Sequence, residues 1–132
     1  MLQRLIETGF LKAQAPEPKH DQWKLADHNA SVLKISDSLT VAIEIIPTVE
    51  KSELLKWLRK ATLILAAYEG GQDCSLQLQD EKWLLWRFYD DNVDENELSQ
   101  GVVMHLAIAK YLEKGFKEKK NHKRDFVMRM RT

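Results

Sequence analysis

Cysteine is almost missing from this sequence. The 132 residues contain one cysteine, Cys74, so no disulfide can form within the chain. Disulfide frameworks hold together small secreted domains that cannot build a sufficient core. A chain of this length can instead bury one hydrophobic core, and its single thiol suits a reducing compartment.

Long apolar runs are missing as well. No window approaches the roughly 18 apolar residues of a membrane-spanning helix. The first ten residues, MLQRLIETGF, are too short and too polar for a signal peptide. With 44% hydrophobic and 30% charged residues, the composition is typical of a globular protein. We therefore expect a folded protein of the cytoplasm.

Patterns that carry catalysis or cofactor binding are scarce. The only glycine pair, Gly70-Gly71, follows a predicted helix, so it does not form a phosphate-binding loop. The four histidines are dispersed, and one cysteine cannot build a thiolate zinc site. His105 lies on an apolar helix stripe, which favours a hydrogen-bonded core or interface histidine over a catalytic base. We expect no enzyme activity, no metal and no cofactor.

The charges balance overall but are unevenly distributed. Nine of the twenty lysines and arginines and three of the twenty carboxylic acids lie between Lys110 and Thr132. This end therefore has a net charge of +6, and the other 109 residues have −6. An acidic body is a poor platform for nucleic acid. We expect residues 1–118 to form a single domain and residues 119–132 to form a basic, solvated C-terminal tail.

Alternating hydrophobicity predicts strands in the first half of the chain. Residues 39–46 alternate with the period of a strand that has one face on a core. The turn Ser36-Asp37-Ser38 joins them to a shorter apolar run at 32–35, which predicts an antiparallel hairpin. A further short strand is expected at 22–25.

A second hairpin is predicted at 74–79 and 82–89, with Asp80-Glu81 as its turn. Residues 82–89, KWLLWRFY, are apolar on both faces, which is typical of a strand buried on both faces. We expect Trp86 and Phe88 to belong to the core.

Three helices complete the pattern. A weak apolar stripe covers residues 2–13 and is interrupted by Gly9. A long helix is expected to begin at Thr48, as its N-cap, and to end near Tyr68. The last helix begins at Asp94, an N-cap with a glutamate three residues later.

The predicted order is α-β-β-β-α-β-β-α, an α+β domain with an antiparallel sheet flanked by helices. The helix at 48–69 and the strand at 82–89 carry more apolar surface than one small domain can cover. A second protein chain is the simplest cover for that surface. We therefore expect a protein-binding module that dimerises.

This order, at this length, resembles the class I chaperones of bacterial type III secretion systems, which share a Tir chaperone-like fold. The resemblance spans residues 1 to about 116. It is carried by a short N-terminal helix ending near Gly9, the SLTVAIEII strand, the long helix before Gly70-Gly71, the CSLQLQD/KWLLWRFYD hairpin and the final amphipathic helix.

The resemblance implies a function and partners. Such a protein would bind a non-globular segment of a secreted effector or secretion regulator and keep it soluble and competent for export. It would be a cytoplasmic bacterial homodimer, or a heterodimer with a second chaperone, without nucleic-acid binding or membrane insertion. The alternative is a small adaptor or immunity-type protein that binds and regulates one folded partner.

The resemblance also assigns residues. The dimer interface would use the long helix and the strand after it, namely Trp57, Ile64, Tyr68, Leu76 and Leu78. Grooves for the bound segment would be lined by the first helix and the first strands, namely Leu5, Trp23, Leu25, Leu33, Ile35, Val41 and Ile43.

Overall fold

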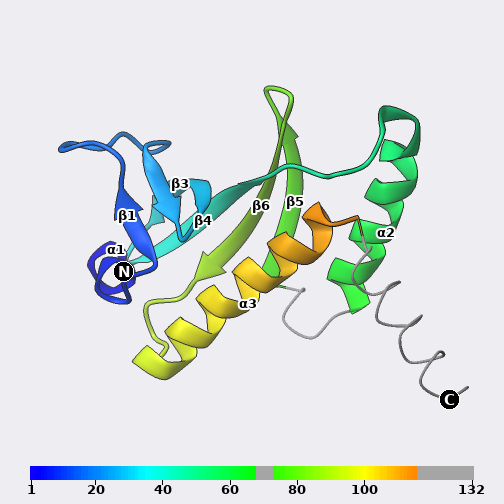
Figure 1. The fold of residues 1–132 in the computed structure, drawn as a ribbon. Coiled ribbons are helices and arrows are strands. Elements are labelled where there is room, and N and C mark those ends of the chain that lie inside the picture. The colour runs from blue at the N-terminus through cyan, green and yellow to red at the C-terminus, as the bar shows by residue number, and fades with distance from the viewer. Residues whose placement is uncertain (68–72, 116–132) are drawn as a thin grey trace, which may run out of the picture.

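The computed structural model describes residues 1–67 and 73–115 (Figure 1). Its first half contains α1 (Leu2–Glu7), β1 (Leu11–Ala13), β2 (Trp23–Leu25), β3 (His28–Ile35) and β4 (Ser38–Ile45). Its second half contains the 3-10 turn η1 (Lys51–Glu53), α2 (Leu54–Ala67), β5 (Cys74–Gln79), β6 (Lys82–Tyr89) and α3 (Glu95–Glu113). The predicted α+β class is confirmed, with one strand more than predicted. The proposed domain boundary at 118 and the tail after it lie outside the described residues.

The six strands form one antiparallel sheet in the order β1-β2-β3-β4-β6-β5. The long connection through α2 carries the chain past β6, so that β5 lies at the outer edge and β6 returns beside β4. The pairing of β4 with β6 runs from Leu39 opposite Tyr89 to Ile45 opposite Trp83. These two strands are therefore the centre of the sheet, and β1 and β5 are its edges.

Both predicted hairpins are confirmed. Two-residue turns join β3 to β4 at Ser36-Asp37 and β5 to β6 at Asp80-Glu81. Ser36, Asp80 and Glu81 have positive φ angles of 56°, 51° and 65°. Positive φ is what the backbone twist of tight hairpin turns requires, although glycine and asparagine adopt it more easily.

One predicted helix boundary is confirmed and one is wrong. The short N-terminal helix ends just before Gly9, which at a φ of 84° turns the chain away, so the rest of the apolar stripe over residues 2–13 is not helical. The carbonyl of Phe10 then accepts the amide of Ala26 at 2.8 Å, and β1 pairs with β2. Thr48 does not cap α2, since its hydroxyl and its amide both donate to the carbonyl of Glu113, at 2.7 and 2.8 Å.

The helices lie on one face of the sheet, and the core lies between them (Figure 1). The predicted N-cap at Asp94 is confirmed, because its Oδ1 accepts the amide of Glu97 at 2.8 Å. From this cap α3 crosses β4 and β6, and α2 packs beside β5. The fully covered side chains between α3 and the sheet include Leu39, Val41, Ile43, Leu85, Leu98, Val102 and Leu112.

No helix in the described part of the chain combines the length and the apolar character that crossing a membrane requires.

Candidate protein-binding site

The sheet face opposite the helices carries an apolar stripe. Leu33 of β3, Thr40 of β4 and Phe88 of β6 are neighbours in register. Leu33 is 55% exposed and Phe88 is 47% exposed, and Ile35, 49% exposed, lies two residues further along β3. None of the described helices covers this face, which we call the open face (Figure 1). A contiguous exposed apolar patch on a small domain is typical of an interaction surface.

Trp86 and Phe88 belong to this open face, so their prediction as core residues is wrong. Trp86 is half-buried, and its indole Nε1 donates to Oε1 of Gln77 at 2.7 Å. The alternation along β6 is as predicted, but the core side holds Leu85 and Tyr89 instead. Both faces of β6 are apolar, so its pattern alone does not identify which one a helix covers.

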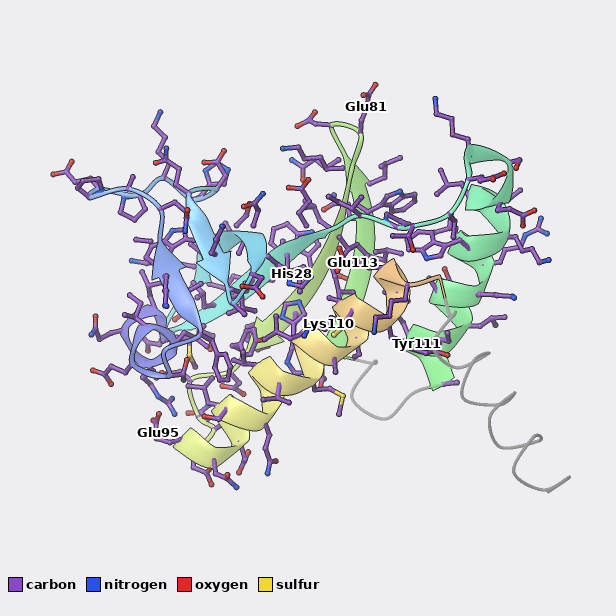
Figure 2. All side chains as sticks on the ribbon, viewed as in Figure 1. His28, Glu81, Glu95, Lys110, Tyr111 and Glu113 are labelled. Carbon is purple, nitrogen blue, oxygen red and sulfur yellow. The ribbon has the colours of Figure 1, made fainter. Side chains whose placement is uncertain are left out.

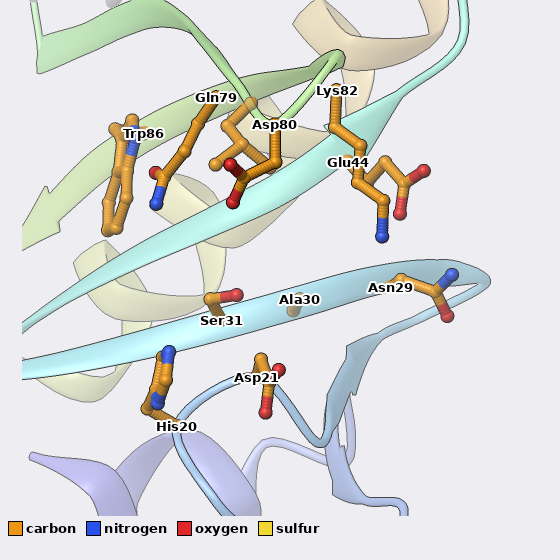
Figure 3. Close-up of a pocket in the computed structure, with 11 residues that line it drawn as sticks. His20, Asp21, Asn29, Ala30, Ser31, Glu44, Gln79, Asp80, Lys82 and Trp86 are labelled. Carbon is orange, nitrogen blue, oxygen red and sulfur yellow. The ribbon is translucent and has the colours of Figure 1, made fainter.

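A cleft of about 320 Å³ adjoins the stripe on the open face (Figure 3). The β1–β2 loop forms one side and the β5–β6 turn forms the other. Its charged and aromatic lining residues are His20, Asp21, Glu44, Asp80, Lys82 and Trp86. Three carboxylates face one lysine ammonium here, so the cleft favours a cationic group.

A second apolar surface lies on α2 and β5. Leu55 and Leu63 on the outer side of α2 are 60% and 68% exposed, and Leu78 of β5 is 57% exposed. The helix packs beside β5, and β5 is an edge strand of the sheet. An edge strand presents backbone donors and acceptors to which another chain can pair. We call this the α2/β5 surface.

The structure divides the seven residues assigned to the segment-binding groove. Leu33 and Ile35 lie on the open face and are exposed. The other five are buried in the core on the helix side, namely Leu5, Trp23, Leu25, Val41 and Ile43. The four strand residues of this group point away from the open face because strand residues alternate between the two faces, and Leu5 lies in α1 on the helix side.

The residues assigned to the dimer interface are also divided. Leu78 is exposed, and Ile64 and Leu76 are half-buried at the α2/β5 surface. Trp57 is only 2% exposed, and its indole Nε1 donates to the carbonyl of Leu112 at 2.7 Å. It is a core residue that anchors α2 to α3. Tyr68 lies outside the described residues.

His105 is a core residue with both ring nitrogens engaged. Its Nδ1 accepts the hydroxyl of Tyr89 at 2.9 Å, and its Nε2 donates to the carbonyl of Leu85 at 2.9 Å. Burial lowers the pKa of His105 to about 4, against the smaller opposing effect of the Leu85 hydrogen bond. The neutral imidazole therefore joins α3 to β6, and the structural interpretation of this histidine is confirmed.

Sequence reasoning missed two groups of residues. Leu63 has no role in the predicted interface, yet it is the most exposed leucine of α2. The cleft carboxylates Asp21, Glu44 and Asp80 come from three separate segments, and no local spacing could indicate that they meet. Only the pairing of β3, β4 and β6 brings these segments together.

Comparison with known proteins gives no match, since no protein-family model, no curated protein and no solved structure is significantly similar to this chain.

Proposed function

We propose that this protein is a chaperone that holds a non-globular segment of a secreted protein on the open face and keeps it competent for type III export. The observation that carries this proposal is the exposed stripe of Leu33, Ile35 and Phe88 on a sheet face without a described helix. The order of helices and strands, which resembles that of class I secretion chaperones, supplies the link to export.

An extended segment fits the geometry of the stripe. Alternate residues of a strand lie about 6.5–7 Å apart on one face, and the rows of the open face repeat at the same distance. Apolar side chains of a bound segment would move out of water and pack against Leu33 and Phe88. Each large side chain that becomes fully buried would stabilise the complex by about 1.5–3 kcal/mol. Such binding uses no nucleotide and is reversed when the segment is pulled away.

The α2/β5 surface supports a homodimer. Leu55, Leu63 and Leu78 are large apolar side chains that one copy leaves in water. A second copy would bury the same three residues in return, as a two-fold interface requires. The open face lies on the other side of the sheet from α2 and would stay accessible in each subunit.

Light scattering tests the dimer. The intact protein should have about twice the 15.4 kDa mass of one chain. Leu63→Asp should reduce the mass to that of one chain, because an unpaired charge in an apolar interface costs several kcal/mol. Lys56→Gln, which makes the same change in charge at an exposed site of α2, should leave the dimer intact. A wild-type monomer at micromolar concentration would contradict this part of the proposal.

Binding to reduced, carboxymethylated α-lactalbumin, a permanently unfolded probe, tests the open face. A double variant, Leu33→Ser with Phe88→Ser, should weaken binding at least tenfold. Val103→Ser is the matched control, because Val103 is 55% exposed on α3 and lies away from the open face. Equal binding of native α-lactalbumin would favour the alternative, an adaptor for folded partners. Undiminished binding by the double variant would show that the open face is not the site.

The link to export has its own test in the native bacterium. Loss of this protein should reduce secretion of the partner that co-purifies with it, and expression of the Leu33→Ser, Phe88→Ser variant should not restore secretion. Normal secretion by the deletion strain would contradict the role in export and leave the binding results standing.

A further inference from the structure

The apolar stripe and the cleft are parts of one surface. Along β6, the alternate residues Phe88, Trp86 and Leu84 face the open side of the sheet. Phe88 belongs to the stripe, whereas Trp86 and Leu84 line the cleft, and Glu44 lies opposite Leu84 in register. An extended segment that lies along β6 over the stripe therefore continues into the cleft.

The carboxylates of the cleft have no cationic partner in the described part of the chain. None of Asp21, Glu44 and Asp80 forms a salt bridge there, and neither does the cleft lysine, Lys82. Among the same described residues, no three histidine, cysteine or carboxylate side chains lie close enough together to hold a metal ion. A cation carried on a side chain therefore fits the cleft better than a metal ion does.

An aromatic ring faces the same cleft. Trp86 is half-buried, and the hydrogen bond from its Nε1 to Gln77 fixes the orientation of its indole. Figure 3 shows Trp86 and Asp80 pointing toward the side of the cleft where His20 and Asp21 lie. The face of an indole attracts cations, and the planar guanidinium of arginine can stack on it while donating to carboxylates. The combination of indole and carboxylates favours arginine among the cationic side chains.

The sheet determines the spacing between the two subsites. Phe88 and Leu84 lie four residues apart on β6, which is about 13 Å along the strand. An extended segment has the same rise per residue, and its alternate side chains point to the same side. A side chain four positions from the one that packs on Phe88 therefore points into the cleft, whereas a side chain three positions away points to solvent.

We propose that the open face selects extended segments in which an arginine lies four residues from a large apolar side chain. The apolar side chain packs on Leu33 and Phe88, and the guanidinium lies between the Trp86 ring and the carboxylates of Glu44 and Asp80. This inference rests on the proposed function, because it specifies which segments the open face holds.

Synthetic peptides and the full-length protein test the selection by fluorescence anisotropy. The first peptide has leucine and phenylalanine two residues apart, an arginine four residues beyond the phenylalanine, and serine elsewhere. It is made in both chain directions, and the direction that binds more tightly is used. It should bind about tenfold more tightly than the same peptide with citrulline, which keeps the shape of arginine without its charge. Moving the arginine to the third position should remove this advantage.

A pair of protein variants locates the arginine. Glu44→Gln with Asp80→Asn should remove the advantage of arginine over citrulline and leave binding of the citrulline peptide unchanged. Asparagine tolerates the φ of 51° at Asp80. Glu53→Gln with Glu81→Gln is the matched control, since it changes the net charge equally. Both control residues are exposed, and Figure 2 shows Glu81 at the tip of the β5–β6 turn, pointing away from the sheet. The control should keep the tenfold advantage.

The other outcomes separate this inference from the proposed function. If both peptides bind the wild-type protein equally, and Leu33→Ser with Phe88→Ser weakens both, the inference is wrong and the open face still binds segments. If the arginine advantage persists without the carboxylates of Glu44 and Asp80, or is lost equally in the control, the cleft does not hold the arginine. If neither peptide binds and unfolded α-lactalbumin does not bind either, the proposed function and the inference both fail.

Discussion

The two faces of the sheet are built from alternate residues of the same strands, yet they have opposite roles. On the helix-covered face, Ile43 and Leu85 are fully buried, and on the open face Leu33 and Phe88 are about half exposed. An antiparallel sheet needs only one covered face to fold. The second face is therefore free to keep apolar residues for a partner, and its side chains contribute little to stability.

The largest expected effect distinguishes the two faces by stability. Leu85→Ala should lower the free energy of unfolding by about 2–5 kcal/mol, because it removes a fully buried side chain and leaves a cavity. Leu33→Ala makes the same chemical change on the open face and should alter it by no more than about 0.5 kcal/mol. Urea denaturation measures both. Equal losses would mean that the open face is covered in solution.

The next largest effect is the pH dependence of stability that His105, on the helix-covered face, produces. His105 is neutral in the folded protein, since burial lowers its pKa to about 4, while the unfolded chain takes up a proton near pH 6.5. The pKa shift of His105 therefore contributes to the free energy of unfolding above pH 6.5. This contribution, about 3 kcal/mol, is lost as the pH falls toward 4.

Denaturation at pH 7 and at pH 4.5, compared with His105→Gln, isolates this contribution. The variant should be less stable at pH 7, because it breaks contacts to Tyr89 and Leu85, but its stability should depend less on pH in this range. The same pH dependence in both proteins would assign the loss to other groups.

The smallest effect concerns the turn beside the open-face cleft. Glu81 has a φ of 65°, which glycine adopts without strain. Glu81→Gly should therefore raise the free energy of unfolding by about 0.5–1 kcal/mol. Lys82→Gly, one residue later in β6, should instead lower it by about the same amount, because glycine weakens a strand. If both changes lower the free energy of unfolding, the Glu81 side chain stabilises the folded protein by more than its backbone strain destabilises it.

The sequence alone determined the local elements. Alternation in 39–46 and 82–89 and the two turn dipeptides predicted both hairpins, and Asp94 with Glu97 predicted the start of α3. These signals suffice because the interactions that produce them link residues close in the chain. The helix boundary at Thr48 was wrong because a distant partner, Glu113, binds the hydroxyl and the amide of Thr48.

Tertiary structure alone decided which apolar residues are covered. Leu85 and Trp86 are both large hydrophobic residues, and α3 packs on the side of Leu85, so Trp86 remains on the open face. The cleft likewise exists only because strand pairing brings together Asp21 of the β1–β2 loop, Glu44 of β4 and Asp80 of the β5–β6 turn. The physical reason is that alternation defines two faces of a strand, whereas burial depends on which face another part of the chain packs against.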